Sequence, residues 1–300
     1  MSDFLTILNG SEPIFLTVVI VFSLIIGSFL NVIIFRLPII LQKGWRQQCY
    51  EFLETKVPVT EQPDLMQSQV LLIELFTRPS HCLHCNTPIK FYDNVPLLSY
   101  IILRGKCRSC KHKFSIQYPI IEALAAALAA AVALRFSVSW QTVAGCILSY
   151  VLIVQAAIDL RHTIIPDEVT LPALWIGLLL SIQFVFVNST DAIIGAVAGY
   201  MFLWLVYWSF FWATKKEGMG YGDFKLLAMI GAWLGWQMLP FTILCSSIIG
   251  SVIGVGLIFL HKKKRVKRIP FGPFLSMAGW IAMICGNDIN TWYLQFAGLM

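Results

Sequence analysis

Charged residues are scarce in this chain of 300 residues, in which Asp, Glu, Lys and Arg together make up 13%. Soluble globular domains contain about 25% of these residues. The hydrophobic content is high, at 58%, and the apolar residues gather in runs of about 18, long enough to cross a hydrocarbon core about 30 Å thick. The composition therefore excludes a soluble enzyme and predicts an all-α polytopic membrane protein.

The apolar runs predict eight transmembrane helices, each bounded by charge, proline or glycine. The predicted spans are 14–37, 118–135, 139–159, 169–187, 191–213, 223–240, 241–260 and 271–287. Seven or nine spans also fit, because little polar sequence separates the last runs. The pairs Gly195/Gly199 and Gly231/Gly235 have the spacing at which two helices pack closely.

The positive charges indicate how the spans are oriented. No Lys or Arg precedes Arg36, so the cationic start of a cleavable signal peptide is missing and the first helix is expected to stay. With the N-terminus outside the cytoplasm, 21 of the 22 Lys and Arg lie in or beside predicted cytoplasmic segments, and only Arg135 lies on the far side. This asymmetry follows the positive-inside rule.

The basic run 261–268 has the composition of a nucleic-acid patch. It lies, however, in a short loop between two apolar spans, where anionic lipid head groups explain it. We therefore expect contact with membrane lipid and no nucleic-acid partner.

The polar insert between the first and second spans carries two CxxC pairs, separated by 21 residues. The predicted domains are the first transmembrane helix 1–38, the cytoplasmic insert 39–117 and a seven-helix membrane domain 118–300. The paired cysteines are Cys82, Cys85, Cys107 and Cys110. Their spacing matches a zinc ribbon, in which four thiolates close a tetrahedral shell and leave no position for a substrate. We expect a small zinc-ribbon-like fold around a structural zinc ion.

Other roles for the insert remain open. His81, His84 and His112 flank the cysteines, and each is an alternative metal ligand, although four cysteines already complete the shell. A redox CxxC normally needs one pair and a thioredoxin-like βαβ pattern, which this short insert lacks.

Three carboxylates lie within or at the ends of predicted spans, where ionisable residues are costly and often functional. They are Glu122, Asp159 and Asp223. The predicted topology places Asp159 and Asp223 together at the cytoplasmic mouth of the helices. Two carboxyl groups a few ångströms apart cannot easily both ionise, so they share one proton. The carboxyl pair of an aspartic protease has this property. One member then activates a water and the other polarises a carbonyl.

Simpler interpretations exist for each carboxylate. Asp159 and Arg161 fit an ion pair that snorkels at a helix end, and Asp223 fits a helix N-cap. Glu122 fits a residue that stabilises a helix N-terminus or reaches a polar cavity, and we leave it outside the pair. A proton- or cation-relaying transporter and a membrane scaffold with a zinc adaptor are the rival functions.

Taken together, these motifs resemble those of the bacterial type IV prepilin peptidases, over nearly the whole chain. The motifs are Gly27-Ser-Phe-Leu-Asn-Val32, Arg78-Pro-Ser-His-Cys82, Asn94-Val-Pro-Leu-Leu-Ser-Tyr100, Leu103-Arg-Gly-Lys-Cys107, Tyr118-Pro119, Asp159-Leu-Arg161 with Ile165-Pro-Asp167, and Gly220-Tyr-Gly-Asp223-Phe-Lys-Leu226. The resemblance implies an aspartic protease of the bacterial inner membrane. It would cleave the basic leader of prepilins or type II secretion pseudopilins and then N-methylate the new terminus with S-adenosylmethionine. The family pattern places the catalytic pair on Asp159 and Asp223 and the zinc ligands on the four paired cysteines.

Two parts of the chain are less similar to the family. Leu83 stands where related chains commonly have proline, and 42–77 matches no motif that we can name. No glycine-rich nucleotide fingerprint follows a strand, so the residues that bind the methyl donor are unknown from the pattern. Our hypothesis places that site in the insert together with Gly27–Leu37.

Overall fold

The described residues of the computed structural model are 11–53, 85, 87, 97, 100, 102–216, 218–260 and 269–296. Within them the chain forms eight α-helices and one short 3-10 helix. No strand occurs in these residues, and a single isolated antiparallel bridge joins Lys106 and Lys113. The predicted all-α fold class is confirmed.

Each of the eight predicted spans has a helical counterpart. The helices are α2 (Glu12–Phe52), α5 (Gln117–Phe136), α6 (Trp140–His162), α7 (Asp167–Ile182), α8 (Ser189–Thr214), α9 (Tyr221–Leu234), the 3-10 helix η3 (Trp236–Met238), α10 (Leu239–Leu260) and α11 (Gly272–Phe296). Among the described residues, five segments are long and apolar enough to cross a membrane, namely α2, α5, α6, α8 and Trp236–Gly256. Because α7 and α9 have only 16 and 14 residues and the apolar part of α11 is the shorter segment Gly272–Gly286, the count of eight crossings stays a prediction.

The predicted end of the first helix is wrong. We expected it at 37, before Pro38, whereas α2 continues through Pro38 to Phe52. The proline removes one backbone hydrogen bond. The residues that follow include Gln, Lys, Arg and Leu, which favour helix, and no further proline occurs before Pro58.

The division between the sixth and seventh predicted spans is also shifted. We placed it at 240/241, but α9 already ends at Leu234 and α10 begins at Leu239. Gly235 has φ +81°, a conformation that ends a helix and that favours glycine. Pro240 then lies in the first turn of α10, where its missing N–H costs nothing.

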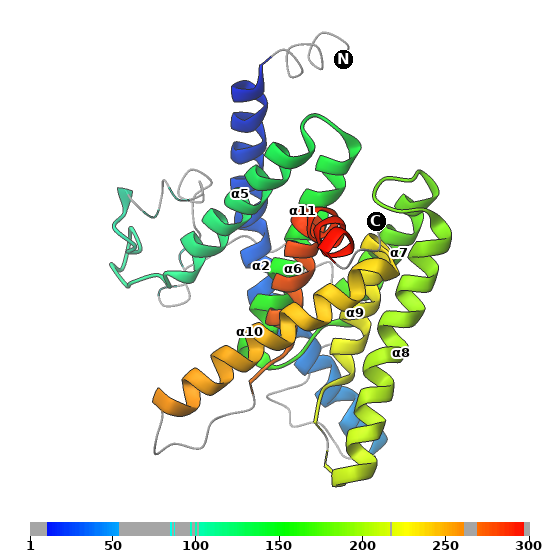
Figure 1. Ribbon diagram of the computed structural model, residues 1–300. Helices are drawn as coiled ribbons and strands as arrows, with labels where there is room; N and C mark the ends of the chain where they lie inside the picture. Colours follow the sequence, from blue (N-terminus) through cyan, green and yellow to red (C-terminus); the bar gives the residue numbers. More distant parts are fainter. Residues whose placement is uncertain are drawn as a thin grey trace. The chain divides into compact units, whose positions relative to one another are not determined.

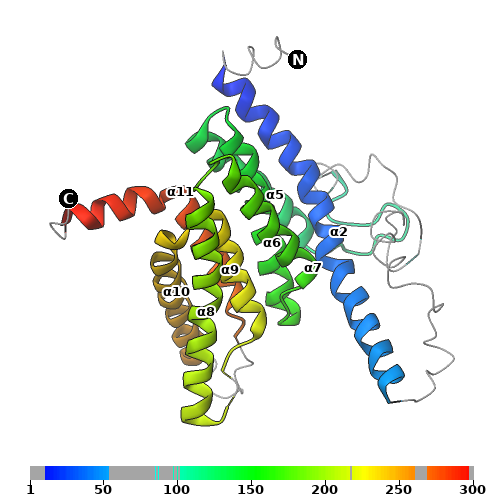
Figure 2. The ribbon, with the colours of Figure 1, turned by 90° about the vertical axis from the view of Figure 1, so that its right-hand side faces the viewer.

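The chain forms two compact units, one of Thr17–Leu128 and one of Ala129–Met300 with Met1–Leu16. The second unit contains α6 to α11, and α9 is its central helix, in contact with α7, α8 and α11 (Figures 1 and 2). The residues Leu226–Leu234 of α9 are all buried. A segment buried on every side is positioned by its neighbours, which fixes the axis of α9.

Small residues allow this close packing. A side chain on Gly195 of α8 would collide with the backbone of Gly231 in α9, and one on Gly199 would lie 2.8 Å from the carbonyl oxygen of Leu227. The predicted role of these glycines in helix packing is confirmed.

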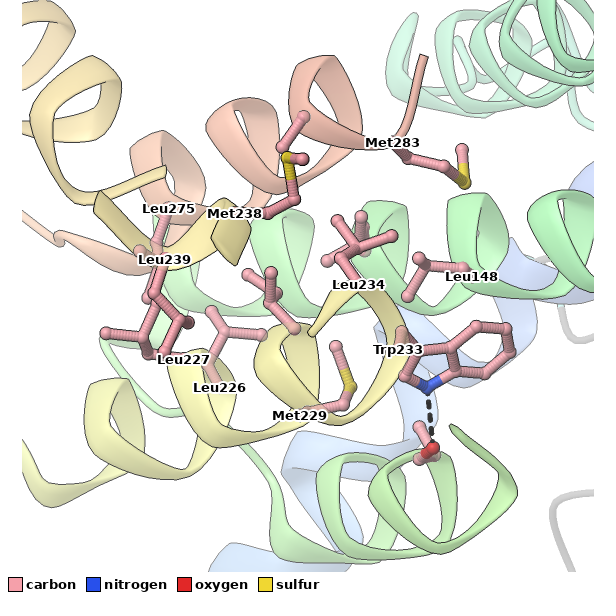
Figure 3. Close-up of a cluster of buried hydrophobic side chains, with 14 of the residues drawn as sticks. Leu148, Leu226, Leu227, Met229, Trp233, Leu234, Met238, Leu239, Leu275 and Met283 are labelled. Atoms are coloured by element: carbon pink, nitrogen blue, oxygen red, sulfur yellow. Dashed lines mark hydrogen bonds between the residues drawn. The ribbon is translucent and has the colours of Figure 1, made fainter. Parts of the chain in front are cut away.

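The core of the second unit lies around the C-terminal half of α9. Figure 3 shows Trp233 and Leu234 of α9 beside Leu148 of α6 and Met283 of α11. The Trp233 indole donates a hydrogen bond of 2.8 Å to the carbonyl oxygen of Ala173 in α7. This bond satisfies the one polar atom of a side chain that is 2% exposed.

Candidate active site

Asp159 lies in the last turn of α6 and is only 5% exposed. The helix ends just beyond it because Thr163 adopts the left-handed conformation, and the Thr163 N–H donates to the carbonyl oxygen of Asp159. The Asp159 carboxylate turns inward, and its Oδ2 accepts a 3.0 Å hydrogen bond from the backbone N–H of Gly272. The first residue of α11 therefore holds Asp159 in place.

Asp223 lies in the first turn of α9 and is 7% exposed. Its neighbour Gly222 packs on Ile165, as does Gly272, whose N–H bonds Asp159, so the starts of α9 and α11 bring the two carboxylates to the same end of the helices. Its Oδ1 atom is buried and has no hydrogen-bond partner among the described residues. A buried acceptor without a protein partner is available to a water molecule, a proton or a substrate.

Two glycines leave the space that this arrangement needs, and both face Ile165. A Cβ on Gly272 would lie 2.5 Å from Asp159 Oδ2 and 3.0 Å from Ile165 Cδ1. A Cβ on Gly222 would lie 2.8 Å from Ile165 Cβ. The loop that carries Ile165 thus packs against the starts of both α9 and α11, and larger side chains at either glycine would separate the elements that hold the carboxylates.

The same loop is tied to α9 by an ion pair. Lys225 Nζ lies 2.6 Å from Asp167 Oδ2, and both side chains are partly exposed. The two polar motifs of the predicted catalytic half therefore contact each other directly, which sets the loop before α7 against the first turns of α9.

The simpler interpretation of Asp159 does not fit its position. A snorkelling carboxylate would reach water, whereas Asp159 is buried. Asp223 is the third residue of α9, and its carboxylate interacts with the backbone of the N-cap Gly220, so a role at the helix start fits it beside a catalytic one. Two buried carboxylates that share a site, one with an open acceptor atom, can exchange a proton with a water between them.

Glu122 belongs to the other compact unit, and it is 7% exposed. Its Oε2 accepts a 2.8 Å hydrogen bond from the backbone N–H of Leu97. Nearby, Asn31 donates to the carbonyl oxygen of Tyr118 at 3.1 Å, while its Oδ1 is buried with no partner in the described part of the chain. These residues form a second buried polar cluster, in α2 and α5.

Three of the four predicted zinc ligands gather in one place. The sulfur atoms of Cys85, Cys107 and Cys110 all lie within 4.8 Å of one another, and the Cys85 and Cys107 sulfurs are 4.0 Å apart. Tetrahedral thiolates with Zn–S bonds of about 2.3 Å are separated by roughly 3.8 Å, so the three positions fit a zinc ion. Cys82 lies outside the described residues.

The backbone around Cys107 forms the turn that brings this cluster together. The Cys107 N–H donates to the carbonyl oxygen of His112 at 2.8 Å, and the Lys111 N–H donates to that of Cys107 at 3.1 Å. The bridge between Lys106 and Lys113 closes the turn. Cys107 and Cys110, with two residues between them, then direct both sulfur atoms to one point, as a zinc-binding CxxC turn requires.

Sequence reasoning missed several residues of the site. Gly272 carries no side-chain motif, although it lies at the start of a predicted span, where the first backbone N–H groups of a helix have no partner within the helix. The pairing of Asp167 with Lys225 had no local signal, because 58 residues separate them.

Comparisons with known proteins agree with these observations. Residues 21–136 match the bacterial peptidase A24 N-terminal domain, and residues 146–255 match the type IV leader peptidase family. The chain is 46% identical to a prepilin leader peptidase/N-methyltransferase of Aeromonas hydrophila, covering 98% of this chain and 99% of that protein. It is 45% and 43% identical to the proteins of the same name from Stutzerimonas stutzeri and Pseudomonas aeruginosa, covering 97% and 96% of this chain and 98% and 97% of theirs. No solved structure matches the chain.

Proposed function

The chain belongs to the type IV leader peptidase family, and from this membership we propose that it cleaves the basic leader of prepilins or type II secretion pseudopilins and then N-methylates the new terminus. Its apolar helices and its relatives make it a multi-pass protein of the inner membrane. The observation that carries the proposal is the burial of Asp159 and Asp223 at helix ends that pack on the same residue, Ile165.

Asp159 and Asp223 are the proposed catalytic residues. The ionised carboxylate takes a proton from a water molecule as the water oxygen attacks the scissile carbonyl carbon, and the protonated carboxyl donates a hydrogen bond to the carbonyl oxygen. When the tetrahedral intermediate collapses, the C–N bond breaks and the amide nitrogen receives a proton from the pair. The products are a leader with a new carboxylate and a pilin with a free amine.

Elements of the site support this chemistry. The N–H of Gly272 holds one oxygen of Asp159, which fixes the direction of that carboxylate. The open Oδ1 of Asp223 is available to the attacking water. The irregular backbone around Gly220, before α9, offers room for an extended substrate strand.

The second activity uses S-adenosylmethionine, which supplies the methyl group that the new amine accepts. Our proposal places its site in the insert together with Gly27–Leu37. The support is the buried polar cluster in α2 and α5, which includes Asn31 of this segment, whose Oδ1 has no partner among the described residues. Asn31 and Glu122 are therefore the side chains that we expect to orient a polar methyl donor.

A structural zinc ion is proposed for Cys82, Cys85, Cys107 and Cys110. Four thiolates would complete its shell, so the ion would crosslink the insert and would activate no water. The proposed division of the chain is the first transmembrane helix 1–38, the cytoplasmic insert 39–117 and the membrane domain 118–300, with the N-terminus in the periplasm. Membrane lipid is the expected surrounding, and no nucleic acid is expected to bind.

The purified chain in liposomes tests both activities at once. We would add a prepilin and S-adenosylmethionine and follow the pilin by mass spectrometry. The expected product has lost its leader and gained one methyl group. An uncleaved prepilin in the presence of folded enzyme would contradict the proposal, and a cleaved but unmethylated pilin would restrict it to the peptidase half.

A further inference from the structure

Half of the unpartnered buried polar atoms among the described residues lie near the aspartates. Six such side-chain atoms occur, and three of them belong to Gln155, Asp223 and Ser276. Gln155 is 0% exposed and Ser276 is 3% exposed. Buried polar atoms are nearly always satisfied by protein or by ordered water, so the two residues outside the catalytic pair need an explanation.

The orientation of the Gln155 amide follows from its neighbour. Its Nε2 lies 2.6 Å from Thr170 Oγ1, and Thr170 Oγ1 lies 2.9 Å from the carbonyl oxygen of Pro166. The Thr170 hydroxyl has one hydrogen, which the Pro166 carbonyl takes, so it can only accept from the amide nitrogen. Gln155 Oε1 is therefore the open atom, and it can only accept.

Ser276 differs from the other buried helical hydroxyls. These usually donate to a carbonyl oxygen three or four residues earlier, as do Ser149, Ser181, Thr242 and Ser246. Ser276 Oγ makes no hydrogen bond in the described part of the chain. The Ser276 hydroxyl is therefore available to donate to an acceptor other than the backbone of its own helix.

Contacts between α6 and α11 place these two atoms at one level. The Gly272 N–H bonds Asp159, and the Trp280 indole N–H bonds Ser149 Oγ at 3.0 Å, so the helices run antiparallel. Gln155 precedes Asp159 by four residues, and Ser276 follows Gly272 by four. Because the helices are antiparallel, both steps lead in the same direction, toward the contact of Trp280 with Ser149. They place Gln155 and Ser276 at one level, one helical turn from the aspartates.

Contacts with α9 show that Ser276 faces the interior. Gly279 of α11 faces Ile230 of α9, where a Cβ would lie 2.8 Å from Ile230 Cδ1. Gly272, Ser276 and Gly279 follow the i, i+4, i+7 spacing of one helical face. Ser276 is thus on the face that lies toward α6 and α9, below the aspartate pair.

We propose that Gln155 Oε1 and Ser276 Oγ hold an ordered water molecule one helical turn below Asp159 and Asp223, and that both residues position the pair for hydrolysis. The water accepts from the Ser276 hydroxyl and donates one hydrogen to Gln155 Oε1. Its second hydrogen is then directed to the carboxylates. A buried water needs two to four polar partners, and this arrangement supplies three. The role in hydrolysis rests on the proposed function.

The test uses Gln155→Met, which keeps the side-chain length and removes the amide, together with Ser276→Ala and the double variant. Ser181→Ala, which removes a buried hydroxyl that donates to the carbonyl oxygen of Leu178 near the end of α7, is the matched control. Each enzyme is reconstituted in liposomes and its kcat and KM are measured on prepilin. We expect each single variant to lose about tenfold in kcat at unchanged KM, since the water bonds a charged pair. The double variant should lose little more, because both side chains hold the same water.

Wild-type kcat in either folded single variant would overturn the proposal, as would a double variant whose loss equals the product of the two single losses. If Gln155→Met does not fold, Ser276→Ala decides alone, because it removes one oxygen atom. Parallel assays of Asp159→Asn and Asp223→Asn separate this failure from that of the proposed function. Those variants remain inactive if only the water site is wrong, and they cleave if the aspartic mechanism itself is wrong.

Discussion

The hydrogen bond between Gly272 and Asp159 gives a sharp prediction, because adding one methyl group disturbs it. In Gly272→Ala the new Cβ would lie 2.5 Å from Asp159 Oδ2, whereas ordinary contacts begin at 3.4 Å. The carboxylate must therefore move by about 0.9 Å, and a misplacement of about 1 Å in an active site slows catalysis roughly 10²-fold. Losing a hydrogen bond to a charged group costs about 1.5–3 kcal/mol, which corresponds to a decrease of roughly 10- to 150-fold in the cleavage rate.

The assay is the initial rate of prepilin cleavage in liposomes at saturating substrate, normalised to membrane abundance. Gly272 has no positive φ, so alanine fits the backbone and the effect should be confined to the site. Gly256→Ala in α10 is the matched control, because a Cβ there meets nothing within 4 Å. A Gly272→Ala enzyme that cuts at the control rate would refute the view that this glycine holds Asp159.

Three further changes test other parts of the molecule. Trp233→Ala should lower the free energy of unfolding by about 3–5 kcal/mol, seen as a lower thermal transition, while Trp175→Ala, on the exposed side of α7, should leave it nearly unchanged. Cys107→Ser should lower zinc content and abundance, yet the folded fraction should still cleave prepilin. A brief chelator pulse should not stop cleavage by the wild type, whereas an immediate loss that zinc reverses would indicate a metal-activated water instead. Lys225→Met should change stability by less than about 1 kcal/mol, since its ion pair with Asp167 is partly exposed; a larger loss in thermal unfolding would show that the pair is essential to the loop.

Much of the fold could be predicted because the apolar runs are long. Every predicted span has a helix, and the all-α class follows from the need to satisfy backbone polar groups in lipid. The errors lie where the composition changes gradually. The helix α2 continues past Pro38 to Phe52, since one proline removes a single hydrogen bond from residues that otherwise favour helix.

The candidate site was partly visible in the sequence. Asp159 and Asp223 stood out as carboxylates beside apolar runs, and both are buried at helix ends that pack on Ile165, although their catalytic role stays a prediction. Cys85, Cys107 and Cys110 also gather as their spacing predicts.

What the sequence could not reveal are contacts that depend on helix register. Gly272 contributes a backbone N–H, and no side-chain motif in the sequence indicates such a donor. Gln155 and Ser276 resemble ordinary helical residues until the antiparallel packing of α6 on α11 places them at one level.

The most direct test of the aspartate pair is prepilin cleavage by Asp159→Asn and Asp223→Asn, each with abundance and zinc content measured. Asp191→Asn is the matched control, because that carboxylate lies at the start of α8 and pairs with Asn188 and Trp236. The account predicts that both site variants are present, zinc-loaded and inactive while the control cleaves normally. Near-normal cleavage by either site variant would contradict it.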